Sequence, residues 1–160
     1  MTDPPATSPQ IRRLRVGDRD LARRLFAVMA EVFEEPHELL GDKYLDDLLA
    51  REDFWAIAAM SGGEVVGGLT AHSLPMTRTE SAEIFIYDVA VRADRQRQGI
   101  GRRLVLELCA AATEAGVGAV FVPVDSADAH ALDFYRALGG VPAPVTIFTF
   151  SAGMRLIRLS

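Results

Sequence analysis

A short glycine-bearing segment is the part of the chain best suited to hold an anionic group. Gln96, Gly99 and Gly101 follow an expected strand over residues 82–91, and a helix is expected from about Gly101 to Ala115. The first N–H groups of a helix lack partners within it and lie at the positive end of its dipole, and glycine lets the backbone approach a phosphate closely. The flanking arginines are Arg95, Arg97, Arg102 and Arg103. The glycine spacing fits neither the dinucleotide fingerprint nor the nucleoside-triphosphate loop, and the alternative to an anion site is a plain turn between strand and helix.

Two acidic residues interrupt the apolar strand that precedes this loop. Glu83 and Asp88 have apolar neighbours, and an unpaired charge at such a place destabilises the fold. Their presence there suggests a functional role. A carboxylate of this kind can take the proton of an incoming ammonium group. Five residues separate the two acids, so alternation along a regular strand predicts that they point to opposite faces. The alternative is that either is a hydrogen-bonded structural carboxylate.

A phenol and two further acids stand near the end of the chain. Tyr135 lies on an expected helix over about 128–138, and a phenol with a pKa near ~10 is neutral at pH 7 and able to protonate a thiolate. Its alternative role is simple packing on the helix. Asp128 stands where it can cap that helix, and Asp125 ends the expected strand before it, where it can bind a substrate amine or orient Tyr135.

Acidic residues are concentrated between residues 31 and 53. The net charge of −5 argues against general affinity for nucleic acid. This stretch is either a solvated helical surface or an electronegative lip that attracts a cationic substrate, with Glu35 among the expected contacts. Its members are Glu31, Glu34, Glu35, Glu38, Asp42, Asp46, Asp47, Glu52 and Asp53.

Other reactive side chains lack a pattern that indicates chemistry. His37, His72 and His130 are scattered without metal-ligand spacing, although His72 is a candidate for lining an acceptor cleft. Cys109 lies on the apolar side of an expected helix and is interpreted as core. A single cysteine excludes an internal disulfide and fits a reducing, cytoplasmic environment. We expect no metal site.

The elements that position the candidate functional residues are expected to form a mixed sheet flanked by helices. Apolar periodicity predicts the elements in the order strand, two helices, three strands, helix, strand, helix, strand, which is an α/β (α+β) architecture. The expected strands cover residues 11–16, 54–60, 65–74, 82–91, 119–124 and 145–150, and the helices 20–33, 42–50, 101–115 and 128–138. A chain of 160 residues favours one domain over 11–160, after a Pro-, Ser- and Thr-rich tail over 1–10 expected to be disordered. No apolar run reaches the length of a membrane span.

The order and spacing of these segments resemble the GNAT acetyltransferase superfamily. The resemblance rests on Val89-Ala90-Val91, the Gln96-x-x-Gly99-x-Gly101 loop, and the segment from Ala131 to Gly139. It implies a mixed, mostly antiparallel sheet of about six to seven strands flanked by about four helices, with acetyl-CoA as the cofactor. The implied cofactor contacts are Val89, Ala90, Val91, Gln96, Arg97, Gln98, Gly99, Ile100, Gly101, Arg102, Asp128, Ala131 and Phe134.

The same resemblance implies roles for the candidate catalytic residues. The N–H of Val89 would face the thioester carbonyl as an oxyanion donor. Tyr135 would donate the proton to the departing thiolate. Asp88, which adjoins Val89, is favoured over Glu83 as the base. No lysine or serine stands in a nucleophile motif, which favours direct transfer in a ternary complex over an acyl-enzyme intermediate.

A narrower resemblance concerns the acceptor. The stretches Glu83–Val91 with Arg97–Ile100, and Val66–Pro75, resemble the gentamicin-type aminoglycoside 3-N-acetyltransferases over roughly residues 20–140. This implies a cationic aminoglycoside acceptor, bound by Asp125, Glu35 and Tyr87, and antibiotic resistance as the outcome. The chain departs from that group at Ser126-Ala127 and over 140–144.

The departures leave other readings open. The alternatives are another small amine (a polyamine, an amino sugar or an amino acid) and a non-catalytic acyl-CoA-binding module. Acetylation of protein lysines or N-termini is a weaker alternative. A homodimer through the apolar segment 145–150 is a further expectation, since the superfamily often pairs through its last strands.

Overall fold

The structure is a computed structural model that describes residues 8–153. Its contacts divide the chain into two compact units, one up to Pro123 and one from Val124 onward. Most of the tail expected over 1–10 lies outside the described residues, while Gln10 already belongs to the first strand. None of the described helices has the length and apolar character needed to cross a membrane.

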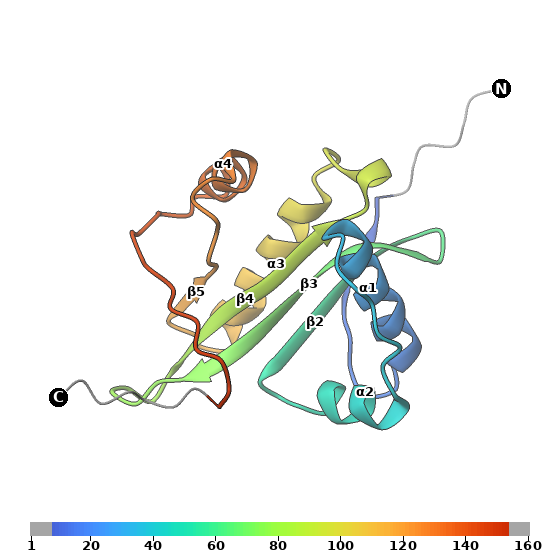
Figure 1. Cartoon of the computed structure of the whole chain (residues 1–160), viewed down its shortest axis with the longest axis horizontal. Coiled ribbons are helices and arrows are strands. Elements are labelled where there is room, and N and C mark those ends of the chain that lie inside the picture. Colours follow the sequence, from blue (N-terminus) through green and yellow to red (C-terminus); the bar gives the residue numbers. More distant parts are fainter. Residues whose placement is uncertain (1–7, 154–160) are drawn as a thin grey trace. The chain divides into compact units, whose positions relative to one another are not determined.

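The first unit is built on a five-stranded sheet whose strands lie in chain order (Figure 1). Strands β1 to β4 pair antiparallel, and β5 pairs parallel with β4. Their bounds are β1 Gln10–Arg13, β2 Phe54–Ser61, β3 Glu64–Pro75, β4 Ala82–Val91 and β5 Ala119–Phe121. Strand β4 is therefore an interior strand of this sheet, as its apolar residues on both faces predict.

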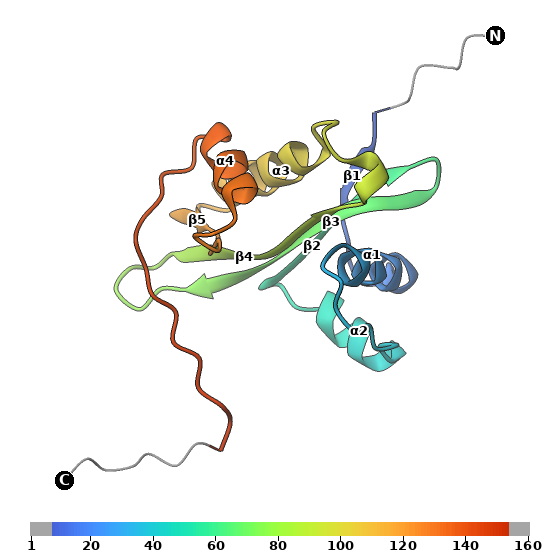
Figure 2. The same cartoon turned by 45° about the horizontal axis from the view of Figure 1, so that its top comes forward.

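Helices cover both faces of this sheet (Figure 2). Helices α1 (Arg19–Val32) and α2 (Asp42–Leu49) lie on one face, and α3 (Ile100–Glu114) lies on the other. Each helix buries an apolar stripe, with Leu25 and Met29 on α1 and Leu104 and Leu108 on α3. Leu25 packs so closely on β3 that a Cβ built at Gly68 would stand 2.2 Å from its Cδ1 atom. The α1 side of the sheet thus requires glycine at that point.

Strand β4 contains one extra residue in its middle. Thr70 of β3 pairs with Asp88, but the next residue, Ala71, pairs with Ile86, so Tyr87 has no pairing partner on β3. This is a β-bulge, which bends a strand and re-aims its side chains. The side chains of residues 82–91 were expected to alternate regularly between the two faces of the sheet. This alternation is broken between Ile86 and Asp88.

The second unit contains one helix and an irregular segment. Helix α4 spans Ala129–Ala137, and Asp128 caps it by accepting a hydrogen bond from the Ala131 N–H at 3.0 Å, as expected. The strand predicted for 145–150 is wrong, because this segment pairs with no other strand among the described residues and most of its apolar side chains are exposed. The described sheet therefore has five strands, fewer than the six to seven expected.

Candidate active site

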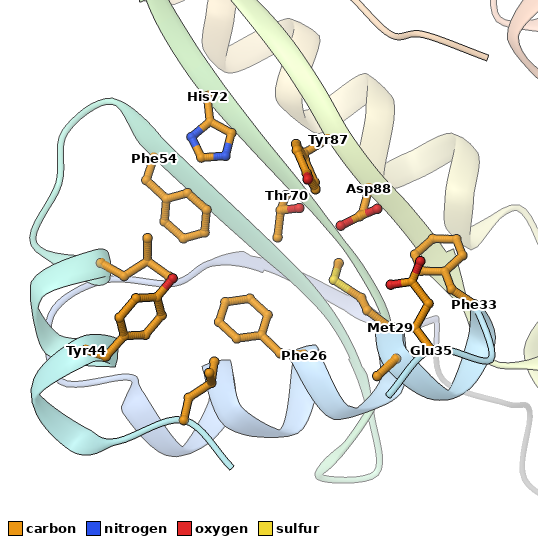
Figure 3. Close-up of a pocket in the computed structure, with 13 residues that line it drawn as sticks. Phe26, Met29, Phe33, Glu35, Tyr44, Phe54, Thr70, His72, Tyr87 and Asp88 are labelled. Atoms are coloured by element: carbon orange, nitrogen blue, oxygen red, sulfur yellow. The ribbon is translucent and has the colours of Figure 1, made fainter. Parts of the chain in front are cut away.

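The bulge opens a pocket on the α1 and α2 side of the sheet. Residues next to each other in a regular strand point to opposite faces, yet Tyr87 and Asp88 both line this pocket. The pocket has a volume of about 290 Å³ (Figure 3). Its lining combines aromatic and aliphatic side chains with a few polar groups: Phe26, Met29, Ala30, Phe33, Glu35, Leu40, Tyr44, Leu48, Phe54, Thr70, His72, Tyr87 and Asp88. This composition is typical of small-molecule sites.

Asp88 is the acidic residue that the sheet contributes to the lining of this pocket. Burial raises the pKa of Asp88 above the ordinary carboxyl value, and the negative charge of Glu35 raises that pKa further. Thr70, its neighbour across the β3–β4 pair, is only 5% exposed and also lines the pocket. A carboxyl group with a raised pKa in a pocket is suited to exchange a proton with a bound amine.

Glu35 reaches the pocket through the turn that ends α1. The N–H of Glu35 donates to the carbonyl of Ala30 at 3.0 Å, and the N–H of Glu34 donates to that of Glu31 at 3.2 Å. These two bonds form a Schellman turn, whose left-handed position is usually glycine. Glu34 occupies it with φ of 55°. The chain thus accepts a strained residue at the point that directs Glu35 into the pocket.

Aromatic rings contribute much of the pocket lining. His72 packs between Phe54 and Tyr87, with ring centroids 5.3 and 5.9 Å away. The Phe54 side chain is buried and also lines the pocket. Thr70 and Tyr44 were not expected at the site. The available signal for Thr70 was a polar residue inside the apolar run of β3.

Glu83 lies outside this pocket, although it is on the same strand. The expectation that Glu83 and Asp88 face opposite sides is wrong, because the bulge at Tyr87 shifts the alternation by one residue. Glu83 alternates in step with Phe85 and Tyr87, whose rings contact each other at 5.9 Å. It thus shares the face of Asp88, but only Asp88 lines the pocket. The structure therefore favours Asp88 as the candidate base.

Basic residues neutralise only part of the acidic stretch over 31–53. Asp42 and Asp46 form ion pairs with Arg19, and Asp42 also pairs with Arg23, so these bonds join α1 to α2. Asp47 pairs with Lys43 and Asp53 with Arg51. Within residues 8–153, no ion pair involves Glu31, Glu34, Glu35 or Glu38. Glu52 also has no ion pair among these residues, so the unneutralised acids are Glu52 and the four glutamates of residues 31–38, of which Glu35 lines the pocket.

The glycine loop has the geometry of an anion site. Gly99 takes a left-handed conformation with φ of 77° and caps α3, and the Arg103 N–H donates to its carbonyl at 3.1 Å. The N–H groups of Ile100, Gly101 and Arg102 precede that first intrahelical bond, so they point beyond the helix end.

Side chains fix this loop from both ends. Gln96 donates to the Val91 carbonyl at 3.0 Å, and Arg95 donates to Ser61 at 3.1 Å and Gln98 at 3.4 Å. Arg97 has a positive φ of 59°. The loop is therefore held in a conformation in which its backbone amides can receive phosphate oxygens.

An unpaired edge of β4 continues from this loop. Strand β5 pairs only with Glu83, Ile84 and Phe85, so the edge over 86–91 has no strand beside it within the first unit. This edge includes Val89, Ala90 and Val91, of which Val89 and Val91 pair on the other side with Leu69 and Gly67. An extended group with amide bonds can add to such an edge as a further strand does. The loop and the edge together fit the pyrophosphate and pantetheine arm of coenzyme A.

The remaining candidates lie in the second unit. Burial raises the pKa of Tyr135 to about 12, so its phenol stays protonated at neutral pH, and its ring lies 4.9 Å from that of Phe134. The carboxylate of Asp125 accepts the Ala127 N–H at 2.8 Å, which closes the turn ahead of α4. Among residues 8–153, no group of three or more His, Cys, Asp or Glu side chains is placed to hold a metal ion.

Comparisons with known proteins agree with this geometry. The family model "Acetyltransferase (GNAT) family" matches residues 20–139. No curated protein sequence matches the chain significantly. Among solved structures, the aminoglycoside acetyltransferase meta-AAC0020 from an uncultured soil metagenomic sample is 33% identical, in a trehalose complex with a TM-score of 0.86 and in a sisomicin complex with 0.85. In both complexes the alignment covers 90% of this chain and 96% of the other.

Two further solved structures extend the comparison. The aminoglycoside acetyltransferase HMB0005, also from an uncultured soil metagenomic sample, is 30% identical with a TM-score of 0.86, covering 92% of this chain and 100% of the other. AAC(6')-Iy in complex with a bisubstrate analogue, CoA-S-monomethyl-acetylneamine, shares the fold at 15% identity and a TM-score of 0.74, covering 91% and 99%.

Proposed function

The chain belongs to the acetyltransferase (GNAT) family, and from that premise we propose that it acetylates an amino group of an aminoglycoside, at the 3-amino position. The acyl donor of this family is acetyl-CoA. The observation that carries the proposal is the pocket into which the bulge directs both Tyr87 and Asp88. It joins aromatic walls to carboxylates, which suits a ring that bears ammonium groups.

The glycine loop and the free edge of β4 are proposed to hold the donor. The amides of Ile100, Gly101 and Arg102 receive the pyrophosphate, with Arg97, Gln98 and Gly99 beside them. Bound there, acetyl-CoA supplies an acetyl group activated as a thioester. The N–H of Val89 is proposed as the donor to the thioester carbonyl, in line with the role that the sequence resemblance implies.

Asp88 is proposed to take the proton of the acceptor amine. Alkylammonium groups are mostly protonated at pH 7, so a base must remove a proton before the nitrogen can attack. The raised pKa of Asp88 brings its basicity closer to that of the amine than an ordinary carboxylate allows. Tyr87, 64% exposed at the pocket mouth, is proposed as an acceptor contact.

Tyr135 is proposed to return a proton to the thiolate that leaves. A phenol with a pKa of about 12 is fully protonated at neutral pH and therefore able to act as a donor. Asp128 and Ala131, bonded to each other at the start of α4, and Phe134 are proposed to contact the cofactor arm. Asp125 is proposed as a further acceptor contact.

The aminoglycoside acceptor follows from similarity together with charge. The relatives meta-AAC0020 and HMB0005 are aminoglycoside acetyltransferases, and one was crystallised with sisomicin. Glu35 lines the pocket, and the acids of residues 31–38 have no basic partners among residues 8–153, which favours a cationic acceptor. The alternatives are another small amine, such as a polyamine, an amino sugar or an amino acid, because Ser126-Ala127 and residues 140–144 depart from the 3-N-acetyltransferase pattern.

An acceptor panel tests the proposal. Purified protein with acetyl-CoA is assayed for thiol release with sisomicin, gentamicin, spermidine, glucosamine and free amino acids. We expect the highest kcat/KM with the aminoglycosides, and NMR of the product should place the acetyl group on the 3-amino nitrogen. A preference for spermidine or amino acids would contradict the proposed aminoglycoside acceptor. Acetylation at another nitrogen of the aminoglycoside would contradict the proposed 3-amino position. Binding of acetyl-CoA without turnover of any amine would favour a non-catalytic module.

Two expectations about the whole protein stand as further proposals. A homodimer is proposed to bury the exposed side chains of Val145, Ile147, Phe148 and Phe150. Light scattering after size-exclusion chromatography gives the mass that decides this. A cytoplasmic location is proposed from the single cysteine, and cell fractionation tests it.

A further inference from the structure

The segment between β4 and the glycine loop is bonded to the turn that joins β2 and β3. Where the chain leaves β4, the Arg92 N–H donates to the Val66 carbonyl of β3 at 2.9 Å, so both segments lie at the same end of the sheet (Figure 2). The short helix η1 (Ala93–Arg95) follows. From its last residue, Arg95 Nη2 donates to the hydroxyl of Ser61, the last residue of β2, at 3.1 Å. The sheet thus holds the residue that directly precedes Gln96.

The same guanidinium also contacts the loop itself. Arg95 Nε donates to the side-chain oxygen of Gln98 at 3.4 Å, so one side chain joins β2 to the residue before Gly99. Arg97 lies between these two positions in the chain and has φ of 59°, which is unfavourable for a residue that carries a side chain. Such a conformation persists only where the surrounding bonds over-determine it. Without the bonds of Arg95, the loop is free to relax to another shape.

We propose that Arg95 and Ser61 hold the glycine loop in the conformation that binds coenzyme A, and that Arg95 is a positioning residue and not a ligand of the phosphates. This inference rests on the proposed donor site and names what keeps that site in its binding shape. A loop that is already fixed loses little conformational freedom when the cofactor binds, so its affinity is higher. When the loop is released, only the fraction of molecules in the binding conformation takes up the cofactor, and the affinity falls by that fraction.

The four arginines around the loop differ in what their side chains contact. Arg95 contacts β2 and the loop, and Arg103 donates to the Ser8 hydroxyl at 3.2 Å. Arg97 and Arg102 are exposed, and their side chains make no hydrogen bond or ion pair within residues 8–153. A guanidinium group of this kind can bind phosphate oxygens without first giving up a bond within the protein. Arg97 and Arg102 are therefore available to the phosphates, whereas Arg95 contributes through the shape of the loop.

Calorimetric titration with coenzyme A tests the inference on matched variants. The set is the wild type, Ser61→Ala, Arg95→Met, the double variant of these two, and Ser61→Thr, which keeps the hydroxyl. Arg24→Met is the control for charge, because Arg24 donates from α1 to the Gly63 carbonyl of the same β2–β3 turn at 3.0 Å and has no bond to the loop. Thermal unfolding checks that each variant is folded.

Hydrogen exchange separates a positioning residue from a phosphate ligand. The exchange of the backbone amides of residues 96–101 is measured by mass spectrometry in protein free of coenzyme A. A side chain that only binds phosphate leaves the loop unchanged before the cofactor arrives. Ser61→Ala and Arg95→Met should therefore both raise the exchange rate of this segment about tenfold, while Ser61→Thr and Arg24→Met should stay within about twofold of the wild type.

Each of Ser61→Ala and Arg95→Met should weaken coenzyme A binding about tenfold, as when roughly one loop in ten keeps the binding conformation. The double variant should lie within about twofold of Arg95→Met, because both changes remove the same contact. Wild-type affinity in Ser61→Ala, additive losses in the double variant, unchanged exchange in both single variants, or an equal loss in Arg24→Met overturns the inference.

Gly99→Ala, titrated beside these variants, tests the proposed donor site itself. Weaker binding in Gly99→Ala together with wild-type affinity in Ser61→Ala would overturn the inference and leave the donor site in place. Wild-type affinity in both would refute the donor site and the inference together. Absence of sisomicin turnover beside the expected pattern of coenzyme A binding would refute the proposed acceptor alone and support the inference.

Discussion

Replacing Asp88 with asparagine should separate catalysis from stability. Asparagine has nearly the same size and keeps the pocket filled, but it cannot accept the proton of the amine. General base catalysis contributes on the order of 10² to 10⁴ in rate. Since each tenfold change corresponds to about 1.4 kcal/mol, the loss raises the barrier by roughly 3–5 kcal/mol. Turnover with sisomicin should therefore fall by about a hundredfold or more.

The stability of the same variant should move in the opposite direction. Burial, aided by Glu35, raises the pKa of Asp88 in the folded protein above its value in the unfolded chain. The folded state therefore binds this proton more readily, and the charged carboxylate destabilises the fold at every pH above the raised pKa. This destabilisation disappears as the pH falls through the window between the raised and the unfolded values. At pH 7, Asp88→Asn should unfold at the same temperature as the wild type or a higher one.

The assay follows thiol release from pH 5 to pH 9, with thermal unfolding measured in the same buffers. Wild-type kcat/KM should fall as the pH drops through the raised pKa of Asp88, because the base becomes protonated. The other titratable groups lining the pocket are Glu35, His72, Tyr44 and Tyr87. The His72→Gln variant is therefore measured as well, to test whether His72 causes the fall of kcat/KM at low pH. Glu83→Gln is the matched control on the same strand, outside the pocket.

The reasoning fails if Asp88→Asn keeps more than about a tenth of the wild-type rate, since that loss is below what a general base contributes. It also fails if the variant retains the acid limb of the wild-type profile. A marked drop in unfolding temperature would show that the carboxylate is a structural element of β4. A large loss in Glu83→Gln would transfer the role of base to Glu83.

Three further changes test the other parts of the site. Gly99→Ala places a side chain at φ of 77°, which costs roughly 1–2 kcal/mol, so the unfolding temperature should drop by a few degrees and calorimetry should show weaker acetyl-CoA binding. Tyr135→Phe should lower kcat by on the order of 10²-fold while the acetyl-CoA dissociation constant stays within about twofold; equal losses in both would remove its acid role. Glu34→Gly relieves the left-handed strain after α1 and should raise the unfolding temperature by about 2–4 °C, and a lower temperature would contradict the assignment of the Schellman turn.

Sequence reasoning located the elements well because each has a strong local signal. The helices α1, α2, α3 and α4 begin and end within about two residues of the expected positions, since their apolar periodicity is clear. The interior position of β4 in the sheet followed from apolar residues on both faces. The segment 145–150 shows why such signals have limits. Its composition is typical of a strand, but a strand also needs a paired neighbour, which periodicity does not reveal.

The site was only partly predictable, because one extra residue rearranged it. Asp88, Tyr87 and Glu35 were expected at the acceptor site and all line the pocket. No local sequence pattern indicates the bulge at Tyr87. For that reason the prediction that Glu83 and Asp88 point to opposite faces of the sheet was wrong. Thr70 was not singled out, since its importance depends on its pairing with Asp88 across strands that are distant in the sequence.

A crystal structure with coenzyme A and sisomicin tests most directly whether the pocket beneath α1 and α2 receives the acceptor. An amino nitrogen of the drug should lie within about 3.2 Å of an Asp88 carboxylate oxygen, on the ring that occupies the pocket. The pyrophosphate of coenzyme A should contact the amides of Ile100 and Gly101. Sisomicin bound elsewhere, with no nitrogen near Asp88, would contradict the account.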